Sequence, residues 1–347
     1  MFRPHLLCLA LSVGLCVSGL GPAGAETLKS LLEYGAKQYR AGEYAGAAET
    51  FRQAVKADAN SAEAHYWLAL ALHQSTHRPL DAIAELVAAT KLNPDFAQAH
   101  YELGLLYQMV GRRADAERAF LRAMEIAPKL DDAGLALARL YERGRQTDKA
   151  VQTYRNILAG KPSQPEALYR LGVLYDVLGD LNQARELLTK LTKADPGHAE
   201  GWYQLGRVAE RENQPAKAAE CYRNAVAAKP DFVDAHYNLG FVYLSLQKRE
   251  PAAKEFREVI RIKPEHAEAH MNLGVVYADT GKLDEAEEEF ERAVALKPNQ
   301  AEAQYHFGVF YELNRKDIGK ALVRYRKYLE LGGTDERVER IVKQMSQ

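Results

Sequence analysis

Several histidines have spacings that could support metal binding. His266 and His270 stand four residues apart, the spacing of two zinc ligands on one helix face. Ala267 follows the first of them, where a zinc-protease motif would place a glutamate. His73 and His77 have the same spacing, but no third ligand is evident nearby, and a zinc site needs at least three protein ligands. We therefore expect no metal and no cofactor, and we interpret these histidines as packing or surface residues.

A larger set of side chains has the chemistry of a contact surface. Tyrosine supplies apolar area together with a hydroxyl, and an amide side chain both donates and accepts hydrogen bonds, as an extended peptide backbone requires. Such side chains recur in register, at intervals of 34 or 35 residues or multiples of 34. The tyrosines are Tyr66, Tyr101, Tyr169, Tyr203, Tyr237 and Tyr305, and the amides are Gln204, Asn238 and Asn272.

A period of 34 residues runs through the chain and must position these side chains. Seven prolines from Pro94 to Pro298 follow it, and Leu-Gly pairs, tyrosines and alanines recur on the same period. We count Ala97 as position 1 of one repeat. The recurring residues at positions 4, 7, 8 and 11 then lie on one face of a helix, and those at positions 20, 24 and 27 lie on one face of a second helix. Proline at position 32 ends the second helix. Each repeat is therefore predicted to be a helical hairpin.

This pattern resembles the tetratricopeptide repeat (TPR), whose consensus has the same length and the same key positions. The resemblance implies an all-α fold: an α-solenoid of about nine helical hairpins that forms a right-handed superhelix, in which the first helix of each repeat lines a concave groove. The array is expected to cover residues 26–333. Its repeats are expected to start near residues 28, 62, 97, 131, 165, 199, 233, 267 and 301.

Two insertions and a final segment complete the predicted array. Single-residue insertions between Leu72 and Ala82 and between Tyr311 and Ala321 are expected in the turn between a repeat's two helices, where length changes are tolerated. Residues 334–347 are predicted to form a C-terminal capping helix. One face of this helix carries Val338, Ile341, Val342 and Met345.

The first helix of each repeat has a second stripe opposite its packing face, at positions 2, 5, 6, 9, 12 and 13. We call it the first-helix stripe; in the TPR family it faces the groove. Asn238 and Asn272 on this stripe resemble the asparagine ladder of the repeats in O-linked N-acetylglucosamine transferases, which holds the main chain of a bound peptide. The alternative for the tyrosines is that they pack against the neighbouring repeat. The candidate partner-binding residues are Tyr66, Trp67, Tyr101, Arg139, Tyr169, Arg170, Tyr203, Gln204, Arg207, Tyr237, Asn238, Asn272 and Tyr305.

Charged residues from the middle repeats share this stripe, and two interpretations remain open. Unpaired arginines would attract an acidic segment of a partner, whereas arginines paired with neighbouring carboxylates would form surface ion pairs that each contribute little. The arginines are Arg139, Arg143, Arg170, Arg207 and Arg211, and the carboxylates are Asp132, Glu142, Asp176 and Glu210.

The composition and the absence of a further domain narrow the function. The chain has 46 Lys and Arg residues against 47 Asp and Glu, so no excess positive charge is available for nucleic acid. The repeats and the cap leave no segment for a catalytic domain, and we expect no enzymatic activity.

The N-terminal segment has the pattern of a secretory signal peptide. Arg3 precedes an apolar run from Leu6 to Leu20, and residues 23–25 read Ala-Gly-Ala. We expect cleavage after Ala25 and export to a bacterial periplasm; the alternative is an uncleaved N-terminal membrane anchor. Cleavage would leave Cys221 as the single cysteine, so no internal disulfide is expected.

These observations predict a non-catalytic adaptor. It would bind another protein, or an extended peptide segment of one, in its concave groove, in envelope assembly or secretion. The alternative is a structural or oligomerisation subunit of a membrane-associated complex that uses its convex face and its ends.

Overall fold

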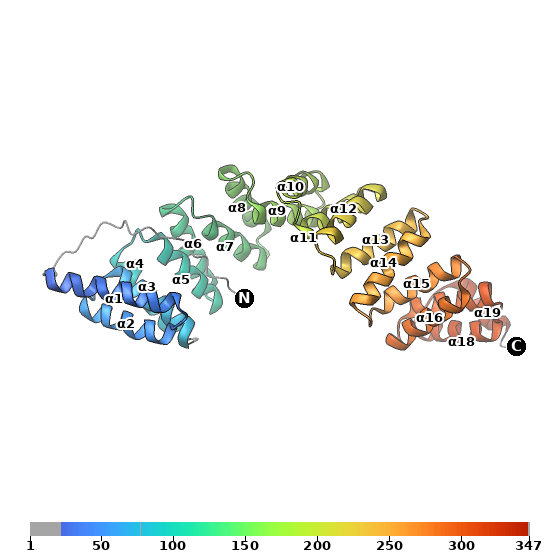
Figure 1. Ribbon diagram of the computed structural model, residues 1–347. Coiled ribbons are helices and arrows are strands. Elements are labelled where there is room, and N and C mark those ends of the chain that lie inside the picture. The colour runs from blue at the N-terminus through green and yellow to red at the C-terminus, as the bar shows by residue number, and fades with distance from the viewer. Residues whose placement is uncertain (1–21, 77, 346–347) are drawn as a thin grey trace. The chain divides into compact units, whose positions relative to one another are not determined.

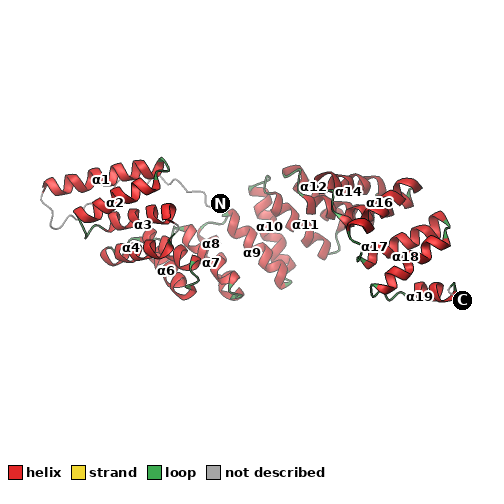
Figure 2. Cartoon of the chain, turned by 90° about the horizontal axis from the view of Figure 1, so that it is seen from below, coloured by secondary structure: helices red, strands yellow, loops and turns green. Residues whose placement is uncertain are grey.

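The computed structural model describes residues 22–76 and 78–345. Helices occupy most of these two ranges, and no strand occurs in them (Figure 2). The predicted signal peptide, residues 1–25, lies outside the described residues except for 22–25, which begin the first helix. Within the described ranges, no helix is both long enough and apolar enough to span a bilayer.

The described residues divide after Gly160 into two compact units. Figure 1 shows their helices coloured in chain order. In the first unit, which we call unit 1, each helix packs against the next one along the chain. Its helices are α1 (Pro22–Arg40), α2 (Tyr44–Ala57), α3 (Ala62–Thr76), α4 (Pro79–Leu92), α5 (Ala97–Met109), α6 (Arg113–Ile126), α7 (Asp131–Arg143) and α8 (Thr147–Gly160).

Unit 2, residues 161–347, continues the alternation of first and second helices and closes with a short helix. Its elements are α9 (Pro165–Leu178), α10 (Leu181–Ala194), α11 (Ala199–Arg211), α12 (Pro215–Ala228), α13 (Val233–Ser245), α14 (Arg249–Ile262), α15 (Ala267–Asp279), α16 (Leu283–Leu296), α17 (Ala301–Val309), the π-helix η1 (Phe310–Arg315), α18 (Ile318–Glu330) and α19 (Glu336–Gln344).

The two helices of a hairpin approach closely because position 8 is small where position 24 is large. A Cβ atom added to Gly206 would lie only 2.6 Å from Cε1 of Tyr222, and one added to Gly104 would lie 2.5 Å from Cε1 of Phe120. Both aromatic rings are fully buried. The glycine therefore provides the space into which the ring packs, as in other tightly packed protein interiors.

Histidines at position 4 join the two helices of their own repeat to the proline at position 32 of the preceding one. In His236, Nδ1 lies 2.6 Å from Oε2 of Glu255 on the second helix, and Nε2 lies 3.1 Å from the carbonyl oxygen of Pro230 before the first helix. His270 has the same two contacts, with Glu289 and Pro264. These histidines are packing residues.

His266 has a separate role from His270. It is the N-cap residue of α15, where its Nδ1 accepts a hydrogen bond from the backbone N–H of Ala269 at 3.2 Å. Across residues 22–76 and 78–345, no group of three or more His, Cys, Asp or Glu side chains could hold a metal ion.

The last repeat differs from its expected geometry in two places. The inserted residue lies within the end of the first helix, which widens into η1, and not in the connecting turn. In the capping helix, Val338 is fully buried and Ile341 and Val342 pack against the same core, but Met345 is 56% exposed. Met345 lies at the C-terminal end of α19, beyond the last core residue that the helix can cover.

Candidate functional site

The candidate residues all lie on first helices, as the first-helix stripe requires. In unit 1 they are Tyr66 and Trp67 on α3, Tyr101 on α5 and Arg139 on α7. The others belong to unit 2 and lie on α9 (Tyr169 and Arg170), α11 (Tyr203, Gln204 and Arg207), α13 (Tyr237 and Asn238), α15 (Asn272) and α17 (Tyr305).

The tyrosine rings at position 5 pack against the residue that leads into the following repeat. The ring centroid of Tyr203 lies 5.0 Å from that of Phe232, and that of Tyr66 lies 4.9 Å from that of Phe96. In both pairs the second residue directly precedes the next first helix. The tyrosine rings therefore stabilise the stacking of repeats, and a partner can reach only the part of each ring that remains exposed.

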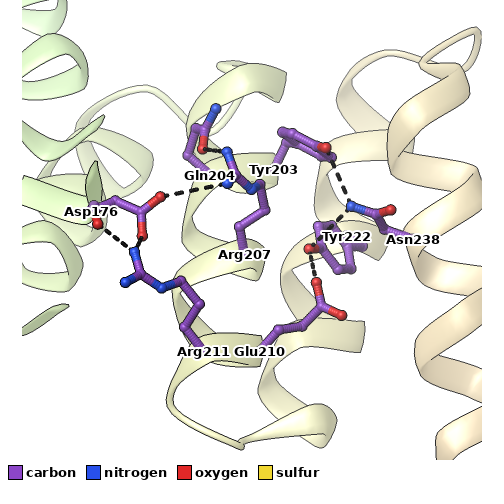
Figure 3. Close-up of polar contacts among 8 residues, drawn as sticks. All are labelled: Asp176, Tyr203, Gln204, Arg207, Glu210, Arg211, Tyr222 and Asn238. Carbon is purple, nitrogen blue, oxygen red and sulfur yellow. Dashed lines mark hydrogen bonds and ion pairs between the residues drawn. The ribbon is translucent and has the colours of Figure 1, made fainter. Parts of the chain in front are cut away.

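Two asparagines at position 6 are oriented by these tyrosines. The Nδ2 atom of Asn238 donates hydrogen bonds to the hydroxyls of Tyr203, at 3.3 Å, and Tyr222, at 3.4 Å (Figure 3). Asn272 donates in the same way to Tyr237, at 3.1 Å. No group in the described part of the chain is hydrogen-bonded to Oδ1 of either asparagine. Each amide nitrogen is thus engaged within the protein, and each amide oxygen keeps its acceptor capacity, with Asn272 only 9% exposed.

Gln204 occupies the same repeat position but has a different role. Its Oε1 accepts a hydrogen bond from Nη1 of Arg207 at 3.1 Å (Figure 3). Gln204 is therefore held within its own helix, and its oxygen has one acceptor position left, whereas the two asparagines are held by the preceding repeat.

The arginines of α11 are paired with a buried carboxylate. Asp176, on the preceding first helix, is 2% exposed. Nη1 of Arg211 lies 2.5 Å from its Oδ1, and Nη2 of Arg207 lies 3.8 Å from its Oδ2 (Figure 3). Arg170 lies 3.8 Å from Glu166. The geometry therefore favours the ion-pair interpretation over attraction of an acidic segment for these three arginines.

In unit 1 the stripe is aromatic and acidic. The Trp67 ring contacts Tyr66, Tyr39 and Phe51, with centroids 5.6, 5.8 and 5.9 Å apart. On α5, Glu102 accepts a hydrogen bond from Nε2 of Gln98 at 3.2 Å. Burial raises the pKa of the Glu102 carboxyl to about 7, although the Gln98 hydrogen bond acts in the opposite direction.

Family models match most of the described chain. Models described as tetratricopeptide repeats match residues 97–130, 143–207 and 242–301, and one described as a TPR repeat matches residues 35–75, 81–111 and 211–247. This chain is a tetratricopeptide repeat protein. A search of curated proteins found no match to it.

Solved structures share the fold of this TPR protein. The C-terminal part of a TPR repeat-containing protein from Cytophaga hutchinsonii aligns with a TM-score of 0.61 at 15% identity, over 70% of this chain and 99% of that one. PilF from Pseudomonas aeruginosa aligns with a TM-score of 0.50 at 20% identity, over 60% and 95% of the two chains. MamA aligns with a TM-score of 0.45 at 29% identity, over 48% and 97%. The first two likenesses show the repeat fold.

Sequence reasoning left Glu102 out of the candidate residues of this TPR protein. Glu102 stands at position 6 of its repeat, the same position as Asn238 and Asn272. That shared position is the signal that could have identified it. The likeness of the two asparagines to an asparagine ladder stays a prediction.

Proposed function

We propose that this TPR protein is an exported, non-catalytic scaffold that binds an extended segment of another protein along its first-helix stripe. The observation that carries the proposal is the pair of oriented amides in unit 2. Asn238 and Asn272 occupy the same position in successive repeats, and each is held by a tyrosine hydroxyl of the preceding repeat. An acceptor repeated in this way suits the N–H groups of an extended peptide backbone.

An apolar side chain lies on the same stripe. Phe241 follows Asn238 by three residues on α13 and is 55% exposed. An exposed aromatic ring beside an oriented amide supplies apolar contact area for a bound segment at a modest entropic cost. The arginines of α11 supply less attraction for an acidic segment than free arginines would, because both lie against the Asp176 carboxylate, which offsets one of their two charges.

The proposed location rests on the sequence of the first 25 residues. Arg3 is followed by an apolar run and then by small residues typical of a cleavage site. This pattern supports export to a periplasm. N-terminal sequencing of the protein from a cell-envelope fraction tests this: cleavage predicts a mature chain that begins at Glu26. An intact N-terminus in the membrane fraction would instead favour the anchored form.

Selection from a random peptide library tests the binding function. The protein is immobilised and panned against dodecapeptides displayed on phage, and the enriched peptides are then synthesised and titrated calorimetrically. We expect the Asn238→Ala/Asn272→Ala variant to bind them at least about tenfold more weakly, because two backbone hydrogen bonds are lost. Asn182→Ala, on the second helix α10, is the matched control and should bind normally.

Two outcomes would contradict this proposal. The first is that no peptide is enriched beyond the level found with an unrelated immobilised protein. The second is that the double variant, with an unchanged circular dichroism spectrum, binds the peptides as tightly as the wild type. Either result would show that the first-helix stripe does not bind peptides in the proposed way. Self-association, or cross-links that map only to second helices and the ends of the chain, would then favour the structural alternative.

A further inference from the structure

We propose that the first-helix stripe of unit 1 recognises a lysine or arginine side chain of a segment bound along it, through Glu102 and Asp132 together with the aromatic ring of Trp67. This inference rests on the proposed peptide-binding function and specifies the chemistry of the partner. It concerns unit 1 alone.

The register of the repeats places Glu102 beside Tyr66. In unit 2, the side chain at position 6 reaches the tyrosine at position 5 of the preceding repeat, as the pair Asn238 and Tyr203 shows. Glu102 and Tyr66 occupy the same two positions in unit 1, and the carboxylate acts electrostatically on the Tyr66 hydroxyl. A neutral amide in unit 2 is thus replaced by a group that, when ionised, can only accept hydrogen bonds and carries negative charge.

Glu102 has no cationic partner among the described residues. Its one hydrogen bond comes from the neutral side chain of Gln98. Other acidic side chains on first helices do have cations: Asp176 pairs with Arg211, and Glu166 pairs with Arg170.

The surroundings of Glu102 make its negative charge unfavourable without a ligand. The charge of Asp132, at position 2 of the next repeat, acts on Glu102 in the same direction as burial and raises the pKa of its carboxyl. A carboxylate that is poorly solvated and lacks a counter-ion gains most from binding a cation.

The aromatic rings beside the carboxylate select for the same kind of ligand. Trp67 contacts both Tyr66 and Tyr39, and each of these tyrosines interacts electrostatically with Glu102. Aromatic faces attract cations, and the alkyl stem of a lysine or arginine packs favourably on apolar surface. Rings alone would accept any apolar side chain, so the neighbouring carboxylates supply the preference for a basic one.

The phage-displayed dodecapeptide selection tests this preference when it is repeated with variants of unit 1. Peptides enriched on the wild-type protein should carry Lys or Arg at a fixed place relative to their other shared residues. Glu102→Gln should abolish that preference while other shared residues persist. Glu33→Gln is the matched control: Glu33 is also at position 6, but it lies 4.0 Å from Lys29 within its own helix, so its loss should leave the preference intact.

A titration then isolates the single contact. One enriched peptide is compared with a copy in which the selected lysine is norleucine, which has a similar apolar stem without the charge. We expect the replacement to weaken binding to the wild type about tenfold, in the range of a carboxylate contact combined with a cation–π contact. The same replacement should have little effect on binding to Glu102→Gln.

The outcomes separate this inference from the proposed function. Enrichment of peptides without any basic preference would overturn the inference and leave the function standing. A basic preference that survives in Glu102→Gln would also overturn the inference, and no enrichment at all would overturn both. Thermal unfolding checks that Glu102→Gln is folded; if it is not, Asp132→Asn replaces it in the same comparison.

Discussion

At the scale of single residues, the position-4 histidines connect packing with pH. Both ring nitrogens of His236 face acceptors, the Glu255 carboxylate and the Pro230 carbonyl. Burial acts to lower the pKa of His236, but the Glu255 and Pro230 contacts outweigh it and the pKa is raised above 6.5. The pKa of His270 is raised in the same way by Glu289 and Pro264, also against the effect of burial. In the folded protein both rings therefore favour the doubly protonated, charged form.

Because the pKa values of these two histidines are raised, we predict that unit 2 loses stability as the pH rises. Because their folded-state pKa is raised, the stability that they contribute is fully present below the unfolded pKa near 6.5 and is lost as the pH rises through the folded-state value. Replacing His236 by Leu should lower the free energy of unfolding by about 2 kcal/mol at pH 6, because Glu255 loses its partner. The loss should be smaller at pH 9.

Denaturant unfolding of the wild type and the His236→Leu variant at both pH values measures these effects. His100 offers a comparison, since it contacts the Pro94 carbonyl but burial lowers its pKa. A His236→Leu variant that loses equal stability at pH 6 and pH 9 would show that the histidine acts by packing alone.

At the scale of the helical hairpin, the small residue at position 8 limits how closely two helices approach. Gly206→Val should lower the free energy of unfolding by about 3 kcal/mol, because the new side chain overlaps the buried Tyr222 ring. Gly160→Ala is the control, since a Cβ atom there meets nothing within 4 Å and improves helix propensity. Chemical unfolding followed by circular dichroism compares the two variants. Equal stability of Gly206→Val and wild type would mean that the hairpin can repack around a larger residue.

The hairpins also show which features a sequence can predict. The 34-residue period places helix starts at Ala97 and Ala267, where the structure has them, because spacing along one helix reflects directly which face is buried. It does not predict that Tyr203 packs on Phe232 or that Asn238 bonds to Tyr203. Those contacts depend on the rotation between successive repeats, which no spacing within one repeat encodes.

The candidate site was predictable to a similar extent. All of the candidate residues lie on first helices, as the period requires, but their hydrogen-bond partners could not be predicted. Gln204 is bonded to Arg207 within its own helix, whereas Asn238 reaches the preceding repeat. The repeat position of Glu102 could be predicted from the sequence, but its lack of a cationic partner becomes visible only when the neighbouring side chains are placed in space.

At the scale of the whole molecule, each of the two units has its own buried core. In unit 1, fully buried rings include Phe51 and Phe120; in unit 2 they include Phe256 and Phe290. In a repeat array, stability is approximately the sum of the stabilities of the repeats and of the interfaces between neighbours. A fragment that keeps several repeats and their interfaces should therefore fold without the rest of the chain.

The fragment of residues 161–347 tests this expectation. It retains α9 to α18 and the capping helix α19, whose Val338 is buried against the last hairpin. We expect a helical circular dichroism spectrum and a single cooperative thermal transition. A fragment of residues 230–347 begins instead inside unit 2 and removes α12, which packs against α13, so it should melt at a lower temperature. The shorter fragment has fewer repeats and fewer interfaces between them, so it should be the less stable of the two. If the longer fragment proved unfolded or less stable than the shorter one, the division at residue 160 would not mark a unit of folding.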